Sequence, residues 1–329
     1  MKCTNKIKVF IPLLGICLLL GGCQERTDVA HAYDIYATSD TYQLTESSTE
    51  KPISLLGQDL CVGGTQNTAA AEGIDTDYAQ SAAVFSIQDE EITYAQNIYQ
   101  RMYPASTTKI LTAYLALKYG NLDDVLTVSS VAVNTLMSGS SICGLKPGDQ
   151  LTLDQALYGL MLCSGNDAAN VIAEYISGST DKFAELMNKE AQALGATSSH
   201  FVNPHGLPDD NHYTTAYDLY LIFNAAIKDD RFVNYISTKK YTTSYTDASG
   251  AQVDQVWVNT NGYLKGTYDM PENVTVIGGK TGTTEAAGSC LVLYSENQDK
   301  KPYISIVLKG NSKKELYTLM TELLTNYSN

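Results

Sequence analysis

The organisation of this chain follows from one stretch, Tyr103-Pro104-Ala105-Ser106-Thr107-Thr108-Lys109, and from the apolar run of residues 110–117 behind it. Pro104 fixes its own backbone angle φ and suits the first turn of a helix. Ser106 and Lys109 are three residues apart, so a helix places them on one face. The stretch therefore predicts a loop that turns into a core-facing helix with a serine at its entrance, ending near Gly120.

A serine at a helix entrance beside a lysine has the parts of an activated nucleophile. A serine hydroxyl attacks efficiently only when a base removes its proton, and a lysine amine is such a base once desolvation or a nearby cation lowers its pKa. The free N–H groups at the helix start can bind an oxyanion. The spacing alone is not specific, because solvated surface pairs at the same spacing occur at Ser48/Lys51, Ser179/Lys182 and Ser237/Lys240.

Two further motifs follow in a fixed order. Ser164-Gly165-Asn166 falls in a break between two predicted helices, where its side chains either point into a cleft or only cap the next helix. Gly278-Gly279-Lys280-Thr281-Gly282-Thr283-Thr284 lies between two predicted strands, where it either holds a carboxylate or forms a glycine-rich hairpin turn. Each motif is weak alone, but the three in this order are typical of penicillin-recognising serine enzymes.

The sequence around the motifs resembles the D-alanyl-D-alanine carboxypeptidases, the low-molecular-mass penicillin-binding proteins of bacterial cell walls. The resemblance covers about residues 82–309, and its segments are Pro104 to Lys109, Ser164 to Ala169, Phe201 to Leu207 and Gly279 to Gly282. It implies an α/β (α+β) fold of the serine β-lactamase type. In that fold a five-stranded antiparallel sheet is flanked by helices and joined to an all-helical lobe.

The resemblance also implies an activity. Ser106 would attack the carbonyl between the two terminal D-alanines of a peptidoglycan stem pentapeptide, with Lys109 as its base and Ser164 relaying a proton to the leaving D-alanine. The chain would then be a serine-type D-Ala-D-Ala carboxypeptidase that β-lactams acylate covalently. Open alternatives are a non-hydrolytic β-lactam sensor or wall-binding lipoprotein, a DD-endopeptidase and a transpeptidase.

The remaining motif residues would bind the substrate. Asn166 would hold the peptide backbone, Lys280 would supply positive potential, and Thr281 and Thr283 would contact the terminal carboxylate beside Gly282. The N–H groups of Ser106 and Thr283 would form the oxyanion hole. We expect no cofactor and no metal.

The order of predicted elements is strands, helices, strands and a last helix. A hairpin at residues 82–87 and 91–95 precedes the first motif. Helices are predicted at 152–162, 167–176, 180–194, 214–228 and 312–324, and late strands at 240–245, 255–259, 274–277, 288–295 and 303–309. The simplest packing joins early and late strands in one antiparallel sheet under the last helix. The helical lobe, about residues 121–235, would form the other wall of a cleft.

The N-terminus predicts an exported, lipid-anchored protein. Residues 1–22 combine a basic start with a short apolar run and small residues before Cys23. This resembles a bacterial lipoprotein signal and implies a lipid on Cys23, with an ordinary secretory leader as the alternative. Residues 23–76 are polar and aperiodic, which predicts a flexible tether. The catalytic domain would then span residues 77–329 without a second, β-rich domain.

Composition and isolated residues exclude several other functions. The formal net charge of −14 argues against a nucleic-acid partner and fits an extracytoplasmic protein. No glutamate lies between Glu190 and Glu272, where a fast class A β-lactamase would need one. The histidines of residues 200–212 match no metal motif and predict a structural loop. None of the three arginines is next to a motif, so no arginine clamp for a carboxylate is assigned.

Overall fold

The computed structural model describes residues 59–328. The predicted signal peptide, Cys23 and the first part of the predicted tether lie outside the described residues. Within residues 59–328, none of the helices is both long and apolar enough to cross a membrane.

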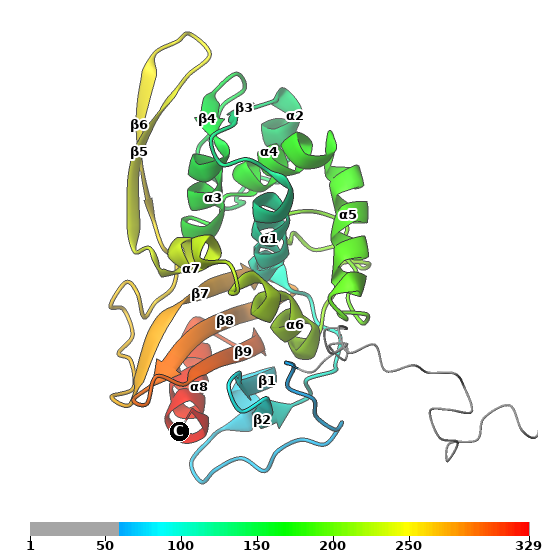
Figure 1. Cartoon of the computed structure of the whole chain (residues 1–329), viewed down its shortest axis with the longest axis vertical. Helices are drawn as coiled ribbons and strands as arrows, with labels where there is room; N and C mark the ends of the chain where they lie inside the picture. The colour runs from blue at the N-terminus through cyan, green and yellow to red at the C-terminus, as the bar shows by residue number, and fades with distance from the viewer. Residues whose placement is uncertain (1–58, 329) are drawn as a thin grey trace, which may run out of the picture. The chain divides into compact units, whose positions relative to one another are not determined.

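The main sheet has five antiparallel strands in the order β2-β1-β9-β8-β7 (Figure 1). Its strands are β1 (Ala79–Ser86), β2 (Glu91–Gln96), β7 (Val274–Thr284), β8 (Gly288–Asn297) and β9 (Pro302–Gly310). Ala83 of β1 pairs with Ala95 of β2 on one side and with Ile306 of β9 on the other. Early and late strands therefore share one sheet, as the sequence predicts.

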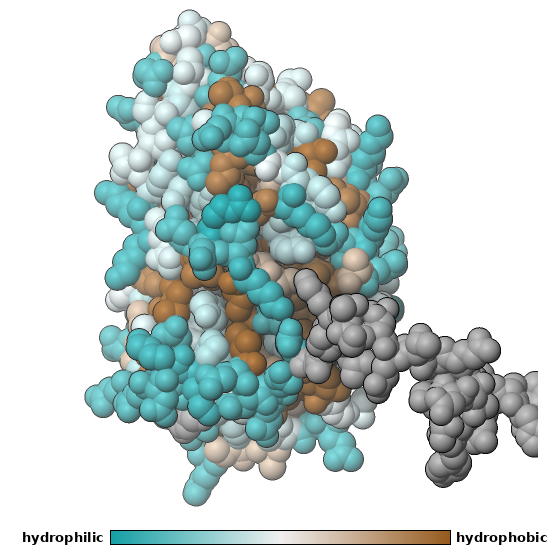
Figure 2. Space-filling view, in the orientation of Figure 1, coloured by the Kyte–Doolittle hydropathy of each residue, from teal (hydrophilic) through white to brown (hydrophobic). Residues whose placement is uncertain are grey.

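Both faces of this sheet are covered by helices. Neighbouring residues of a strand point to opposite faces, so they pack against different layers. Val84 packs with α8 (Lys313–Tyr327), and the next residue, Phe85, packs with the helices of the other layer. The Phe85 ring stacks on Tyr220 of α6 (Ala216–Ala226) with centroids 4.0 Å apart. Val84, Phe85 and Tyr220 are fully buried. The face shown in Figure 2 is mainly hydrophilic or neutral, with apolar patches near its middle.

The helical lobe is built around α1 (Lys109–Tyr119), which is buried on almost every side. Around it lie α3 (Leu153–Leu162), α4 (Asn166–Ser177) and α5 (Thr180–Ala193), and α2 (Ser130–Asn134) packs on α4. Local signals set the ends of these helices: Thr152 and Gln155 form a capping box at α3, and Gly178 ends α4 with φ +80°. The predicted helices agree with the observed ones to within about three residues at each end.

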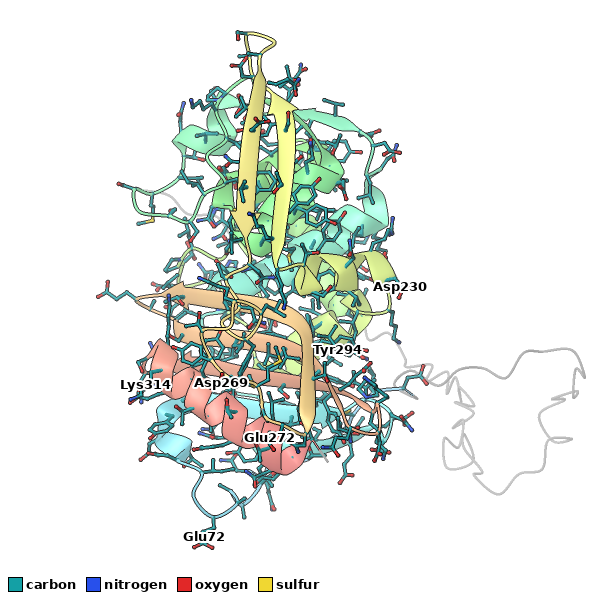
Figure 3. All side chains as sticks on the ribbon, turned by 90° about the vertical axis from the view of Figure 1, so that its left-hand side faces the viewer. Glu72, Asp230, Asp269, Glu272, Tyr294 and Lys314 are labelled. Atoms are coloured by element: carbon teal, nitrogen blue, oxygen red, sulfur yellow. The ribbon has the colours of Figure 1, made fainter. Side chains whose placement is uncertain are left out.

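The strands predicted at 240–245 and 255–259 do not join the main sheet. They are β5 (Lys240–Thr246) and β6 (Gln252–Val258), a hairpin that forms a second sheet, β3-β4-β5-β6, with β3 (Val125–Thr127) and β4 (Gln150–Thr152) (Figures 1 and 3). Every second residue of β5 and β6 is exposed, so the hairpin packs through one face only. The main sheet is covered on both faces, whereas β5 and β6 bury only one face. This pair of strands therefore does not fit in the main sheet. A short helix, α7 (Asp230–Ser237), was not predicted.

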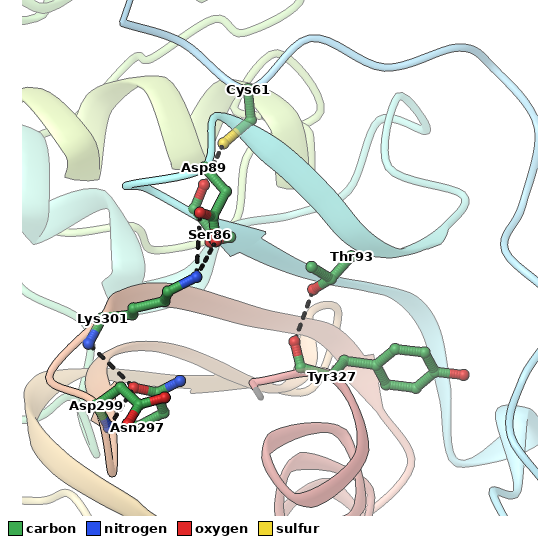
Figure 4. Close-up of polar contacts among 8 residues, drawn as sticks. All are labelled: Cys61, Ser86, Asp89, Thr93, Asn297, Asp299, Lys301 and Tyr327. Carbon is green, nitrogen blue, oxygen red and sulfur yellow. Dashed lines mark hydrogen bonds and ion pairs between the residues drawn. The ribbon is translucent and has the colours of Figure 1, made fainter.

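The later part of the predicted tether packs on the folded domain. Cys61 is fully buried, its N–H donates to the Tyr220 hydroxyl over 2.8 Å, and its Sγ donates to the Ser86 carbonyl over 3.3 Å (Figure 4). The Ala71 N–H donates to the Tyr327 hydroxyl at the end of α8. The polar composition of this segment gave no sign of these few specific contacts. Residues 61 and 71 bond to the folded domain, so the predicted tether extends too far towards residue 76.

Candidate active site

Ser106 lies in a 3₁₀ turn, Ala105–Thr108, that leads directly into α1. Ala105 has a φ of +47°, a left-handed conformation that costs a residue with a Cβ about 1–2 kcal/mol. This strained turn presents the half-buried Ser106 at the helix entrance, where the sequence predicts it. Strain of this kind is typical of functional sites.

Lys109, the first residue of α1, is completely buried beneath Ser106. Its Nζ lies 3.0 Å from Ser106 Oγ and donates to Asn166 Oδ1 over 2.6 Å and to the His205 carbonyl over 2.8 Å. Burial lowers the pKa of Lys109 well below its ordinary value, and the charge of Lys280 lowers it further. A neutral amine at this distance can accept the Ser106 proton.

The second motif forms the turn between α3 and α4. Ser164 has a φ of +62° and is almost fully buried. Gly165 is the N-cap of α4 and makes no side-chain cap. Since neither Ser164 nor Asn166 serves as the cap, their side chains are free to act elsewhere: Asn166 on Lys109, and Ser164 on Lys280.

The third motif lies inside strand β7 and not in a turn between two strands, which corrects the prediction. Lys280 is paired with Val292 and Thr281 with Leu291 of β8. The glycines serve close approach: a Cβ on Gly282 would come 3.0 Å from the N atom of Ser106. Strand β7 therefore runs directly beside the turn that carries Ser106.

Lys280 is buried behind Ser164 and is not an exposed cation. Its Nζ donates to Ser164 Oγ over 3.0 Å and to the Thr281 carbonyl over 2.8 Å. Burial lowers the pKa of Lys280 to about 7. At neutral pH this group is close to half protonated, which suits proton exchange with Ser164 better than permanent attraction of a carboxylate.

A cavity of about 290 Å³ lies over these groups. Its wall includes five of the predicted residues: Ser106, Ser164, Thr281, Gly282 and Thr283. The other three predicted residues, Lys109, Asn166 and Lys280, do not line this wall. Lys109 donates to the Ser106 hydroxyl and Lys280 to the Ser164 hydroxyl, and Asn166 accepts a hydrogen bond from Lys109. The structure thus brings all eight predicted residues of the three motifs together.

The same cavity has lining residues that the motifs did not predict. Lys265 and Lys313 are both exposed lysines at its edge. They are brought together because the loop of residues 259–273 packs on α8: the Gly262 N–H donates to the Tyr317 hydroxyl over 2.7 Å, and Tyr268 stacks on Tyr317. Figure 3 shows Asp269 of this loop and Lys314 of α8 on the same side of the sheet. The two lysines are far apart in sequence, and no local pattern marks them.

The histidine loop supports the turn that carries Ser106. The Val202 N–H donates to His212 Nδ1, so the opposite nitrogen carries the proton and donates to Thr108 Oγ1 over 2.9 Å. Burial lowers the pKa of His212 to about 4, which keeps the ring neutral at physiological pH. Gly206 has a φ of +88°, and a Cβ there would clash with the Ala105 carbonyl. These contacts agree with the predicted structural loop.

The arrangement of the three motifs matches a known family. A family model described as D-alanyl-D-alanine carboxypeptidase matches residues 65–312. The chain belongs to this family. DacF of Bacillus subtilis (strain 168) is 35% identical over 253 residues, which are 75% of this chain and 61% of DacF. DacA of Escherichia coli (strain K12) is 34% identical over 256 residues, 75% of this chain and 60% of DacA. The chain therefore spans about 60% of the length of these D-alanyl-D-alanine carboxypeptidases.

Solved structures of the family have the same fold. The Streptomyces K15 DD-transpeptidase superimposes with a TM-score of 0.70 at 32% identity, covering 76% of this chain and 97% of that one. This likeness confirms the predicted fold class, an antiparallel sheet flanked by helices with a helical lobe.

Proposed function

We propose that this chain is a serine-type D-Ala-D-Ala carboxypeptidase that removes the terminal D-alanine from peptidoglycan stem pentapeptides and binds β-lactams at the same serine. The observation that carries the proposal is the Ser106–Lys109 pair: a fully buried amine 3.0 Å from a hydroxyl that lines a cavity. Family membership supports this substrate class.

Acylation follows from the positions of the two lysine–serine pairs. Neutral Lys109 takes the Ser106 proton while Oγ attacks the carbonyl carbon between the two D-alanines. The N–H groups of Ser106 and Thr283 donate hydrogen bonds to the developing oxyanion. Ser164 passes its proton to the departing amine and is reprotonated by Lys280. Lys109 first releases the Ser106 proton to solvent, and Lys280 regains one from solvent. Water then attacks the ester while neutral Lys109 takes a proton from the water and passes it to Ser106 Oγ as the ester bond breaks. A β-lactam forms the same ester on Ser106 and leaves it slowly.

The substrate's terminal carboxylate needs a positive partner that Lys280 does not fully supply. The Lys280 amine donates to Ser164. Because its pKa is lowered to about 7, it is only partly protonated near neutral pH. Lys265 and Lys313 line the cavity and are exposed, so both place a lysine side chain at its edge. We propose that they attract the carboxylate while Thr281 and Thr283 donate hydrogen bonds to it.

A transpeptidase is the second candidate. Relatives from Streptomyces K15 carry both names: one is called a D-alanyl-D-alanine carboxypeptidase and the other a DD-transpeptidase. Both reactions share the acyl-enzyme and differ in the acceptor, water or an amine. DacF and DacA are both named carboxypeptidases, so the hydrolytic reaction stands first.

We further propose that the enzyme acts outside the cytoplasm, anchored by a lipid on Cys23. The support is the signal-like pattern of residues 1–22 and a substrate that belongs to the cell wall. Replacing Cys23 with alanine should release the protein from the membrane fraction. A variant that stays in the membrane pellet would contradict lipid anchoring at this residue.

The activity is tested by D-alanine release from a pentapeptide ending in D-Ala-D-Ala. Wild-type protein should release D-alanine, and Ser106→Ala should not. Ser179→Ala is a matched control, because Ser179 has the same spacing to a lysine but caps α5 outside the cavity. If folded, penicillin-labelled wild type releases no D-alanine, the carboxypeptidase proposal fails. Release that needs an added amine acceptor would instead establish the transpeptidase.

A further inference from the structure

Two cysteines lie side by side next to the Ser164 turn. The Sγ atoms of Cys143 and Cys163 are 3.3 Å apart, and both residues are free thiols. Cys163 ends α3 and directly precedes Ser164, whereas Cys143 comes from the loop that joins α2 to β4. The contact is between segments 20 residues apart and is therefore a product of the fold.

We propose that Cys143 and Cys163 form a reversible disulfide that slows the acylation of Ser106, so that the dithiol form is the active enzyme. The regulatory half of this inference rests on the proposed role of Ser106, whereas formation of the disulfide does not.

The two thiols are held within bonding reach by glycines. A Cβ on Gly165 would lie 2.1 Å from Cys143 Sγ, and a Cβ on Gly159 would lie 2.6 Å from it. The sulfur thus occupies a notch that only glycines leave open. A disulfide has its sulfurs about 2.05 Å apart, so the two segments must approach each other by roughly 1 Å.

This approach acts on the segments that carry the site. The Asn166 N–H donates to the Ser141 carbonyl over 2.8 Å, and the Cys143 N–H donates to the Asp167 carboxylate over 2.8 Å. Ser141 and Ser164 both line the cavity, and Asn166 holds Lys109. A shift of about 1 Å in groups that position a reaction can lower its rate on the order of 100-fold.

The chemistry is thiol–disulfide exchange with an external disulfide, either a small molecule or a protein. Cys163, the more exposed of the two, attacks one sulfur of the oxidant and releases one thiol. The buried Cys143 then loses its proton and displaces the second thiol. Two cysteine thiols are oxidised to one disulfide, and one external disulfide is reduced to two thiols. Such oxidants operate outside the cytoplasm, where we propose that this protein acts.

The test compares protein treated with oxidised glutathione and protein reduced with dithiothreitol. Peptide mapping after alkylation should find Cys143 linked to Cys163 only in the oxidised sample. Acylation by a fluorescent penicillin should be roughly tenfold or more slower in that sample, and reduction should restore it.

Variants separate this pair from other thiols. Cys163→Ser and Cys143→Ser should each acylate at a rate that glutathione treatment does not change. Cys61→Ala removes another buried free cysteine, one that contacts Ser86 and Tyr220 and not the cavity, and should keep the full response. Absence of the linked peptide, or a linked peptide with an unchanged acylation rate, would overturn the proposal. Reduced protein that fails to acylate would count against the proposed function instead, because the mapping does not depend on Ser106.

Discussion

The two walls of the cavity each pair a buried lysine with a serine hydroxyl at 3.0 Å, one at the start of α1 and one between β7 and the α3–α4 turn. Their surroundings differ. Lys109 donates to an amide oxygen and a backbone carbonyl, and its pKa is lowered well below its ordinary value, mainly by burial. Lys280 donates to a hydroxyl and a carbonyl, and burial lowers its pKa to about 7. The first environment favours a base that activates a nucleophile, and the second favours a group that gives and regains a proton.

The largest effect is expected from removing the base. Lys109→Ala should lower both penicillin acylation and D-alanine release by about 1,000-fold, within the range for general-base catalysis. Lys118→Ala, on the same helix, is the control: Lys118 is 41% exposed and pairs with Glu190 away from the cavity. A melting temperature close to that of wild type would show that the fold persists. Normal acylation by Lys109→Ala would exclude this lysine as the base.

Removing the second lysine should have a smaller and pH-dependent effect. Lys280→Met should lower kcat/KM by about 100-fold at the wild-type optimum, because Ser164 loses its proton donor. A lowered lysine pKa means that the ammonium form dominates below that pKa and is lost above it. Wild-type kcat/KM should therefore fall as pH rises through about 7.

The profile of the variant should lack this fall and keep only the rise that reflects deprotonation of Lys109. Lys314→Met, at an exposed position of α8, serves as the control and should keep the wild-type profile. An unchanged alkaline limb in Lys280→Met would assign that limb to another group and remove the proposed difference between the two pairs.

A third test narrows the space where the two walls meet. Gly282→Ala should slow acylation about tenfold and destabilise the fold by about 1–3 kcal/mol, since the new Cβ meets the turn that holds Ser106. Gly64→Ala provides the comparison, because a Cβ there meets no atom within 4 Å. Acylation kinetics and thermal unfolding of both variants measure the effect. If the two variants behave alike, Gly282 is not required for the close approach of β7.

The sequence predicted the parts of the site that depend on short-range pattern. Ser106 and Lys109 follow from helix spacing, and Asn166 and Lys280 follow from their motifs. The contacts that give each residue its chemistry are long-range, such as Lys109 with His205 or Lys280 with Ser164. Spacing along the chain does not encode burial, so neither the lowered pKa of Lys280 nor its position behind Ser164 was predicted.

The errors in the predicted fold have the same origin. The hairpin of β5 and β6 has good strand residues, yet which sheet it joins depends on how many of its faces can be buried. Cys61 lies in a polar segment, yet it is buried and its N–H donates to the hydroxyl of Tyr220, which is distant in sequence. Lys265 and Lys313 belong to no motif and meet only because a loop folds over α8. They are the residues for which prediction from sequence had no signal.

The smallest effect is therefore expected at these two lysines, which lie outside both lysine–serine pairs. Lys265→Met and Lys313→Met should each raise KM for the pentapeptide about fivefold, equivalent to the ~1 kcal/mol typical of an exposed ion pair, with little change in kcat. The increase should shrink at high salt, because screening weakens exposed charges. Lys314→Met again serves as the control, since it removes a neighbouring charge that does not line the cavity. If KM rises equally in all three variants, net charge and not a carboxylate subsite is responsible. If KM rises in none of the three variants, the carboxylate is held by β7 alone. Lys280 would then supply the positive potential, as its motif suggested.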